Sequence, residues 1–142
     1  MSNADMRPDE YSARQLAAKL GFKPGMRVAL LDAPPGYLVA LDDVATHLEF
    51  CELPATGLDV IQVFVTEQVA LAATLPTLVA ALDQRGALWI CWPKRAAKLP
   101  TDLDDASVRA AGLATGLVDT KVAAIDATWS GLKFVYRLRD RA

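Results

Sequence analysis

The sequence is poor in the residues that most often carry metal or redox chemistry. Its 142 residues include only two cysteines, Cys51 and Cys91, and a single histidine, His47. Neither a CxxC nor an HExxH motif is present, so no zinc site is predicted. Each cysteine lies inside an apolar run, which favours two buried, reduced thiols in a cytoplasmic protein over a disulfide.

Charge of one sign and long apolar stretches are also scarce. The formal net charge is −2, with both signs mixed along the chain, and no basic stripe indicates a nucleic-acid partner. No apolar run approaches the roughly 18 residues of a membrane-spanning helix, and no secretory signal follows the start. We therefore expect a cytoplasmic protein without nucleic-acid or membrane partners, and the pattern indicates no particular oligomeric state.

Apolar residues, in contrast, are plentiful. They make up 53% of the chain, which excludes global disorder, and the length suits one core. We predict a single α/β domain over residues 11–142. Residues 1–10 contain Ser2-Asn3-Ala4 and are interpreted as a disordered or tag-like N-terminus.

The periodicity of the apolar residues predicts alternating strands and helices. Strands are expected at 27–31, 48–53, 59–66, 87–92, 118–126 and 132–138. Helices are expected at 12–20, capped by Ser12, at 37–46, at 67–84 with a break at Pro76 and an end at Gly86, and at 105–114. Uninterrupted apolar runs at 28–31 and 87–92 fit parallel strands buried on both faces, and 87–92 should be central.

The last expected strand has a different pattern. Apolar and polar residues alternate along 132–138, which is typical of an antiparallel strand, and the six residues around 128–131 suit the preceding hairpin turn. The predicted fold class is therefore α/β, with a doubly wound, mostly parallel sheet that ends in an antiparallel C-terminal hairpin strand.

Two resemblances to known families add to this prediction. The parallel sheet with an antiparallel closing hairpin resembles the fold of class I S-adenosylmethionine-dependent methyltransferases. The stretch LGFKPGMRVALLDAPPG resembles the lead-in and first motif of the same enzymes. This implies a Rossmann-like, truncated methyltransferase-like fold, in which Asp32 and Gly36 match the acidic start and the second glycine of the cofactor loop. The segments RVALLDAP, WPKRAAKLPTDL and GLVDTKVAAIDATWSGLKFVYRL are similar to a family of small bacterial proteins catalogued as a domain of unknown function. That second resemblance begins near Tyr11 and implies no activity.

The cofactor loop departs from the methyltransferase pattern. Pro34 stands where the first glycine is expected, and Pro34 and Pro35 both lack an N–H donor. Residues 54–58 are fewer than the dozen or so of a parallel crossover, so the helix and strand that complete the adenosine pocket are expected to be missing. Glu49 or Glu52 could supply the ribose acid, although ordinary surface charge explains both. We predict no tight binding of S-adenosylmethionine and assign no other cofactor and no metal.

The unusual residues of the sequence follow the expected strands. Ligands of open α/β sheets bind beyond the carboxyl ends of the strands. The candidate ligand-binding residues at that edge are Asp32, Gly36, Tyr37, Thr66, Trp92, Lys94, Arg95, Trp129 and Ser130. Four of them, Trp92, Lys94, Trp129 and Ser130, are predicted to share one cleft, with the Lys94 ammonium as counter-charge for an anion. No catalytic residue is assigned.

The alternative for this cluster is purely structural. The tryptophans would then cover the end of the sheet, and the cations would be solvated or paired with Asp102, Asp104 or Asp105. We favour a non-catalytic module that binds a small anionic or nucleotide-like ligand, or a partner. The alternatives are a methyltransferase and an accessory protein without a small ligand. Thr66-Glu67-Gln68 replaces the Asn/Asp-Pro-Pro-Tyr motif of amino-methylating relatives, and no nucleophile–base pair indicates a hydrolase.

Overall fold

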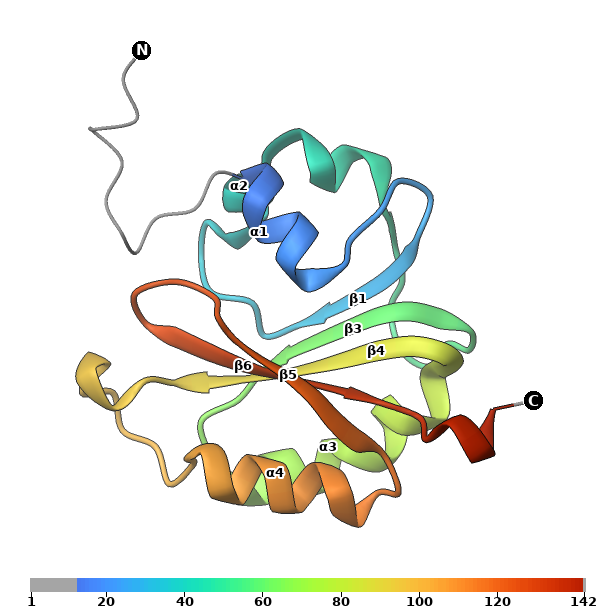
Figure 1. Cartoon of the computed structure of the whole chain (residues 1–142). Helices are drawn as coiled ribbons and strands as arrows, with labels where there is room; N and C mark the ends of the chain where they lie inside the picture. The colour runs from blue at the N-terminus through green and yellow to red at the C-terminus, as the bar shows by residue number, and fades with distance from the viewer. Residues whose placement is uncertain (1–12, 142) are drawn as a thin grey trace.

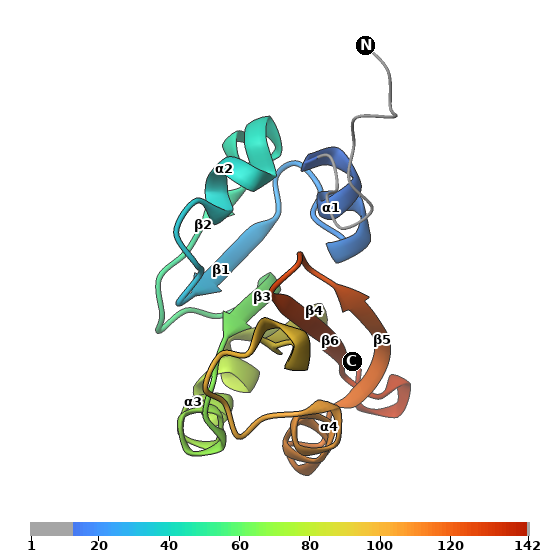
Figure 2. The ribbon, with the colours of Figure 1, turned by 90° about the vertical axis from the view of Figure 1, so that its left-hand side faces the viewer.

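The computed structural model describes residues 13–141, and within them six strands form one sheet with helices on both faces (Figure 1). Helices α1 (Ala13–Leu20) and α2 (Tyr37–Leu41) cover one face, and α3 (Gln68–Ala81) and α4 (Asp105–Ala114) cover the other (Figure 2). The expected N-terminal segment 1–10 and the Ser12 cap lie outside the described residues. None of the helices in 13–141 has the length and apolar character needed to cross a membrane.

The sheet has the predicted mixture of strand directions. Its strands are β1 (Arg27–Leu31), β2 (Glu49–Phe50), β3 (Leu58–Phe64), β4 (Leu82–Pro93), β5 (Val118–Ala124) and β6 (Trp129–Val135). The order across the sheet is β2-β1-β3-β4-β6-β5. Strands β1 to β4 run parallel to one another, and β6 runs antiparallel to both β4 and β5. The predicted fold class is confirmed.

Strand β4 is the centre of the sheet, as its apolar run predicts. It lies between β3 and β6, and Trp89 and Ile90 are both 0% exposed. Alternate side chains enter two separate cores: Ile90 and Trp92 face α3 and α4, whereas Trp89 and Cys91 face α1 and α2. The indole N–H of Trp89 donates to the Leu20 carbonyl over 3.0 Å and so fixes α1 on the sheet.

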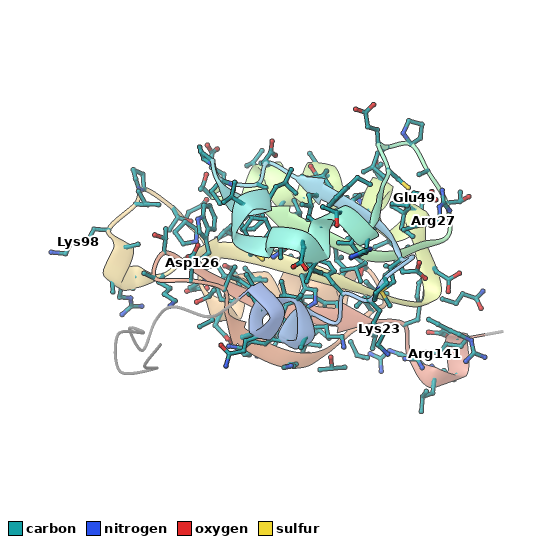
Figure 3. The ribbon with its side chains drawn as sticks, turned by 90° about the horizontal axis from the view of Figure 1, so that it is seen from above. Lys23, Arg27, Glu49, Lys98, Asp126 and Arg141 are labelled. Atoms are coloured by element: carbon teal, nitrogen blue, oxygen red, sulfur yellow. The ribbon has the colours of Figure 1, made fainter. Side chains whose placement is uncertain are left out.

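Strand β2 is much shorter than the expected 48–53. Its two residues pair with the amino end of β1, and the chain then reaches β3 through residues 51–57. Arg27 holds this short connection. Its Nε lies 3.1 Å from Glu49 Oε2, and its guanidinium donates to the Thr56 carbonyl over 2.6 Å. Figure 3 shows Arg27 and Glu49 together at the end of the sheet opposite Lys98.

Helix α3 does not break at Pro76. It continues from Gln68 to Ala81, because Pro76 and Ala72 are both exposed and water can hydrate the carbonyl that loses its N–H partner. Gly86 does not end the helix but lies buried in β4, at an irregularity opposite the start of β3. A Cβ at this position would lie 2.7 Å from the Leu58 carbonyl oxygen, so the backbones approach too closely for any other residue.

The hairpin comes earlier than expected. Strand β6 begins at Trp129, and β5 ends at Ala124, so the turn occupies 125–128 rather than the six residues around 128–131. The Asp126 carboxylate organises it by accepting from the amides of Thr128 and Trp129, both over 2.8 Å. The expected helix 37–46 becomes α2 followed by a 3-10 helix, η2 (Asp42–His47), whereas α4 has the predicted bounds.

Candidate functional site

The loop after β1 lies at the carboxyl edge of the sheet, where the sequence predicts a ligand. Asp32 is exposed, with a φ of 56°, and the loop turns at Gly36, with a φ of 82°. The amide of Tyr37 closes the turn by donating to the Pro34 carbonyl over 3.1 Å. Tyr37 then begins α2 and is buried, so its ring lies in the core rather than on the ligand side.

A buried chain of polar groups anchors this loop to the sheet. The Tyr37 hydroxyl donates to Gln62 Oε1 over 2.8 Å, and Gln62 Nε2 donates to the Cys91 sulfur over 3.4 Å. Burial raises the pKa of the Tyr37 hydroxyl and raises the pKa of the Cys91 thiol to about 12. Both groups are therefore neutral at physiological pH. The hydrogen bonds among Tyr37, Gln62 and Cys91 thus position the loop rather than supply a reactive group.

A second feature of the carboxyl edge is a cleft of about 620 Å³ beyond the end of β4. It lies between η3 (Arg95–Ala97), the segment that follows it, the start of α4 and the β5–β6 pair. The lining residues are Trp92, Pro93, Lys94, Arg95, Leu99, Thr101, Asp102, Leu103, Asp104, Asp105, Val122 and Ser130. The structure thus brings four of the nine predicted site residues together: Trp92, Lys94, Arg95 and Ser130.

Trp129 does not line this cleft, and its predicted place there is wrong. It lies at the expected end of the sheet, because it pairs with Pro93 while Ser130 pairs with Trp92. Neighbouring strand residues point to opposite faces, so Trp129 packs on the α1 and α2 side. There its ring meets the edge of Phe64, with centroids 5.2 Å apart and an interplanar angle of 89°.

Thr66 does not line the cleft, but its backbone carbonyl positions the segment that does. Its carbonyl accepts the Thr101 hydroxyl over 2.6 Å and the Asp102 amide over 3.3 Å, which ties the end of β3 to the segment before α4. The sequence did not assign Thr101, Asp102, Leu99 or Val122 to the cleft. The pairing of β5 with β6 brings Val122 close to the end of β4, and periodicity alone does not reveal that neighbour.

The three cleft carboxylates all have structural partners. Asp102 Oδ1 accepts from the amide of Gln68 at the start of α3 over 2.8 Å. Asp104 caps α4 by accepting from the amide of Ser107 over 2.7 Å, and these bonds lower the pKa of its carboxyl. Asp105 pairs with Arg109 one turn along the helix. Each carboxylate is thus held by a helix start or a guanidinium.

Lys94 differs from these carboxylates. Its amide donates to the Thr128 carbonyl over 2.7 Å and fixes the backbone beside the hairpin. Its ammonium makes no ion pair with any residue of 13–141, so the pairing with aspartate allowed by the sequence does not occur there. Arg95 lies near enough to Asp104 to contribute to that carboxyl's lowered pKa. The cleft therefore presents two cations without an ion pair among residues 13–141: Lys94, half-buried at the end of the central strand, and the more exposed Arg95.

The strand order and the carboxyl-edge loop define a protein of the S-adenosylmethionine-dependent methyltransferase fold, and solved structures agree. A methyltransferase of this class from Aquifex aeolicus matches with a TM-score of 0.64 and 14% identity over 92% of each chain. A putative type 11 methyltransferase from Sulfolobus solfataricus matches with a TM-score of 0.60 and 13% identity, over 94% of this chain and 96% of that one. At such identities the similarity shows the fold alone.

A third similar structure contains a bound product of the cofactor. It is the magnesium protoporphyrin IX methyltransferase of Synechocystis PCC 6803 with bound SAH, with a TM-score of 0.57 and 13% identity over 88% of this chain and 80% of that one. No family model and no curated protein sequence matches the chain. The resemblance to the small bacterial family therefore stays a prediction.

The residues at the carboxyl edge do not fit the whole of S-adenosylmethionine. Asp32 and Gly36 occupy the loop after β1 as expected, but Pro34 and Pro35 offer no N–H donors there. Strand β2 ends beside Val28, so Glu49 lies at the amino end of the sheet and pairs with Arg27. The other candidate for the ribose acid, Glu52, is exposed in the connection that follows β2. Within 13–141 no cluster of His, Cys, Asp and Glu is placed to hold a metal ion either.

Proposed function

We propose that the protein binds a small anionic molecule in the cleft beyond β4, within a domain of the methyltransferase fold. The observation that supports this most directly is the Lys94 ammonium, which has no ion-pair partner among residues 13–141. Each carboxylate that lines the same cleft is already engaged by a helix start or by Arg109. A bound anion would supply the missing counter-charge.

The shape and place of the cleft support the same proposal. Its volume of about 620 Å³ lies within the usual range for small-molecule sites, roughly 300–1,000 Å³. It opens at the carboxyl edge, where open α/β sheets take their ligands. Ser130 lines it too, and its half-buried hydroxyl can donate to the same anion.

The second candidate is S-adenosylmethionine-dependent methyl transfer. The comparisons favour it over a purely binding role, because the similar structures are named as methyltransferases and match nearly the whole chain. The cofactor would have to lie against Asp32 and Gly36, and Glu49, which pairs with Arg27 at the amino end of the sheet, would not contact its adenosine half.

Titrations followed by amide chemical shifts test both candidates in the full chain. Inorganic phosphate should shift the amide signals of Lys94 and Ser130, and Lys94→Ala should weaken this binding at least tenfold. Lys23→Ala is the matched control, because it removes the same charge at the end of the sheet opposite the cleft (Figure 3). Equal binding by the wild type and Lys94→Ala would overturn the proposal.

The same titration with S-adenosylmethionine separates the second candidate. Methyl transfer requires binding that shifts the amides of Asp32 and Gly36 and weakens on Asp32→Ala. Shifts at Lys94 without shifts at Asp32 would favour anion binding alone. Tight binding at Asp32 would instead make the methyltransferase the better proposal and overturn the expectation drawn from Pro34 and Pro35.

A further inference from the structure

The cleft that contains Lys94 also has an exposed apolar wall. Leu99 is 44% exposed and Val122 is 55% exposed, and both line the cleft. Leu99 comes from the segment after η3, whereas Val122 comes from β5, where it pairs with Leu132. Two distant segments thus bring aliphatic side chains to one cleft, and about half of each side chain stays exposed there.

The charge around the cleft limits the charge of its ligand. Three carboxylates line it, those of Asp102, Asp104 and Asp105, and each already has a partner. Two lining cations stand against them: Lys94, which has no ion pair in the described chain, and Arg95, which has none there either but lies near Asp104. A polyanion such as a nucleoside triphosphate would meet repulsion from the carboxylates, whereas the Lys94 ammonium can balance a single negative charge.

We infer that the ligand of this cleft is a monocarboxylate with an apolar tail, bound with its carboxylate at Lys94 and its tail against Leu99 and Val122. This inference rests on the proposed anion binding and adds the class of ligand. Ser130 completes the polar end, and Trp92 forms the apolar floor beside it. Burial of each methylene of the tail contributes about 0.8 kcal/mol, which corresponds to about fourfold in affinity.

A series of fatty acids of increasing length tests the inference in the full chain. Amide shift titrations with acetate, butyrate, hexanoate and octanoate should give affinities that rise by up to about fourfold per methylene until the tail leaves the cleft. Lys94→Met should weaken the binding of every member. Val122→Thr keeps the size and strand preference of the side chain, and it should reduce the gain with length while leaving the acetate affinity unchanged. Val69→Thr changes an exposed valine on α3 outside the cleft and serves as control.

The outcomes separate this inference from the proposed function. Phosphate binding at Lys94 with no gain along the fatty-acid series would overturn the monocarboxylate and leave anion binding intact. An undiminished length dependence in Val122→Thr would overturn the placement of the tail. Absence of any shift at Lys94 with every anion, phosphate included, would overturn both proposals.

Discussion

The hydroxyl of Tyr37 donates a 2.8 Å hydrogen bond to the side-chain carbonyl of Gln62 in the interior of the protein. The bond joins the first residue of α2 to the middle of β3, and Gln62 is fully buried there. Because the loop from Asp32 to Gly36 leads directly into Tyr37, this one contact fixes where the loop ends.

Tyr37→Phe should lower the free energy of unfolding by about 1–3 kcal/mol, because it leaves a buried amide oxygen without a donor. Urea denaturation measures this loss. Tyr136→Phe is the matched control: the Tyr136 hydroxyl donates to the Val79 carbonyl over 3.0 Å, in a partly buried place that water can reach. A larger loss in Tyr136→Phe than in Tyr37→Phe would contradict the importance given to Gln62.

Gly112→Ala in α4 should destabilise the protein although alanine favours helices. A Cβ at Gly112 would overlap the ring of Phe134, which is fully buried in β6 and has no room to retreat. Overpacking of this kind costs about 1–3 kcal/mol and exceeds the gain in helix propensity of up to about 1 kcal/mol. Thermal unfolding gives the sign, and a higher melting temperature would contradict the tight packing of α4 on β6.

The two cysteines should react very differently with a thiol reagent such as DTNB. Burial raises the pKa of Cys91 to about 12, and its side chain is fully enclosed, whereas Cys51 is partly exposed. We expect one equivalent of thiol to react in the native protein at pH 8 and both to react in guanidinium. Cys51→Ser should abolish the native-state reaction. Rapid modification of native Cys51→Ser would show that β4 opens more easily than its burial indicates.

Because Asp104 caps α4, the stability of the protein should depend on pH in the acidic range. Hydrogen bonds from Ser107 lower the pKa of Asp104 in the native state below its ordinary value of about 4. The carboxylate therefore stabilises the fold fully above that value, and the contribution is lost as the pH falls through the lowered native pKa.

Asp104→Ala should accordingly lower the melting temperature at neutral pH, and its difference from the wild type should shrink below about pH 4. Asp43→Ala, which removes an exposed carboxylate from η2, is the control. A difference for Asp104→Ala that stays constant down to about pH 2 would show that the carboxylate charge does not stabilise the helix.

The fold was predictable where apolar patterns are long. The run at 87–92 indicates a central strand, and β4 is central, with Trp89 and Ile90 fully buried. Pro76 misleads because local propensity opposes a helix, yet the packing of Leu71, Leu75 and Leu78 on the sheet keeps α3 continuous. The extent of β2 was not predictable either, because only two residues pair and three-dimensional neighbours decide where pairing stops.

The sequence predicts at which edge of the sheet the site residues lie, but not on which face of the sheet each side chain lies. Strand order alone places Trp92, Lys94 and Ser130 together, and they line one cleft. The face of Trp129 depends on the register of β6 against β4, and a one-residue change in register reverses it. The sequence pattern does not give this register, because the hairpin turn lies earlier in the chain than its composition suggests.

The short connection from β2 to β3 is a place where this protein should tolerate an insertion. Residues 51–57 run along the end of the sheet opposite the cleft, and Arg27 fastens both of their ends through Glu49 and Asp59, whose carboxylate accepts the Arg27 amide over 2.9 Å. A longer segment could leave and re-enter between these two anchors while β1, β3 and β4 keep their pairing. Grafting a crossover helix and strand there would extend the sheet beyond β2, and it would measure how much inserted sequence this domain accepts while it still folds.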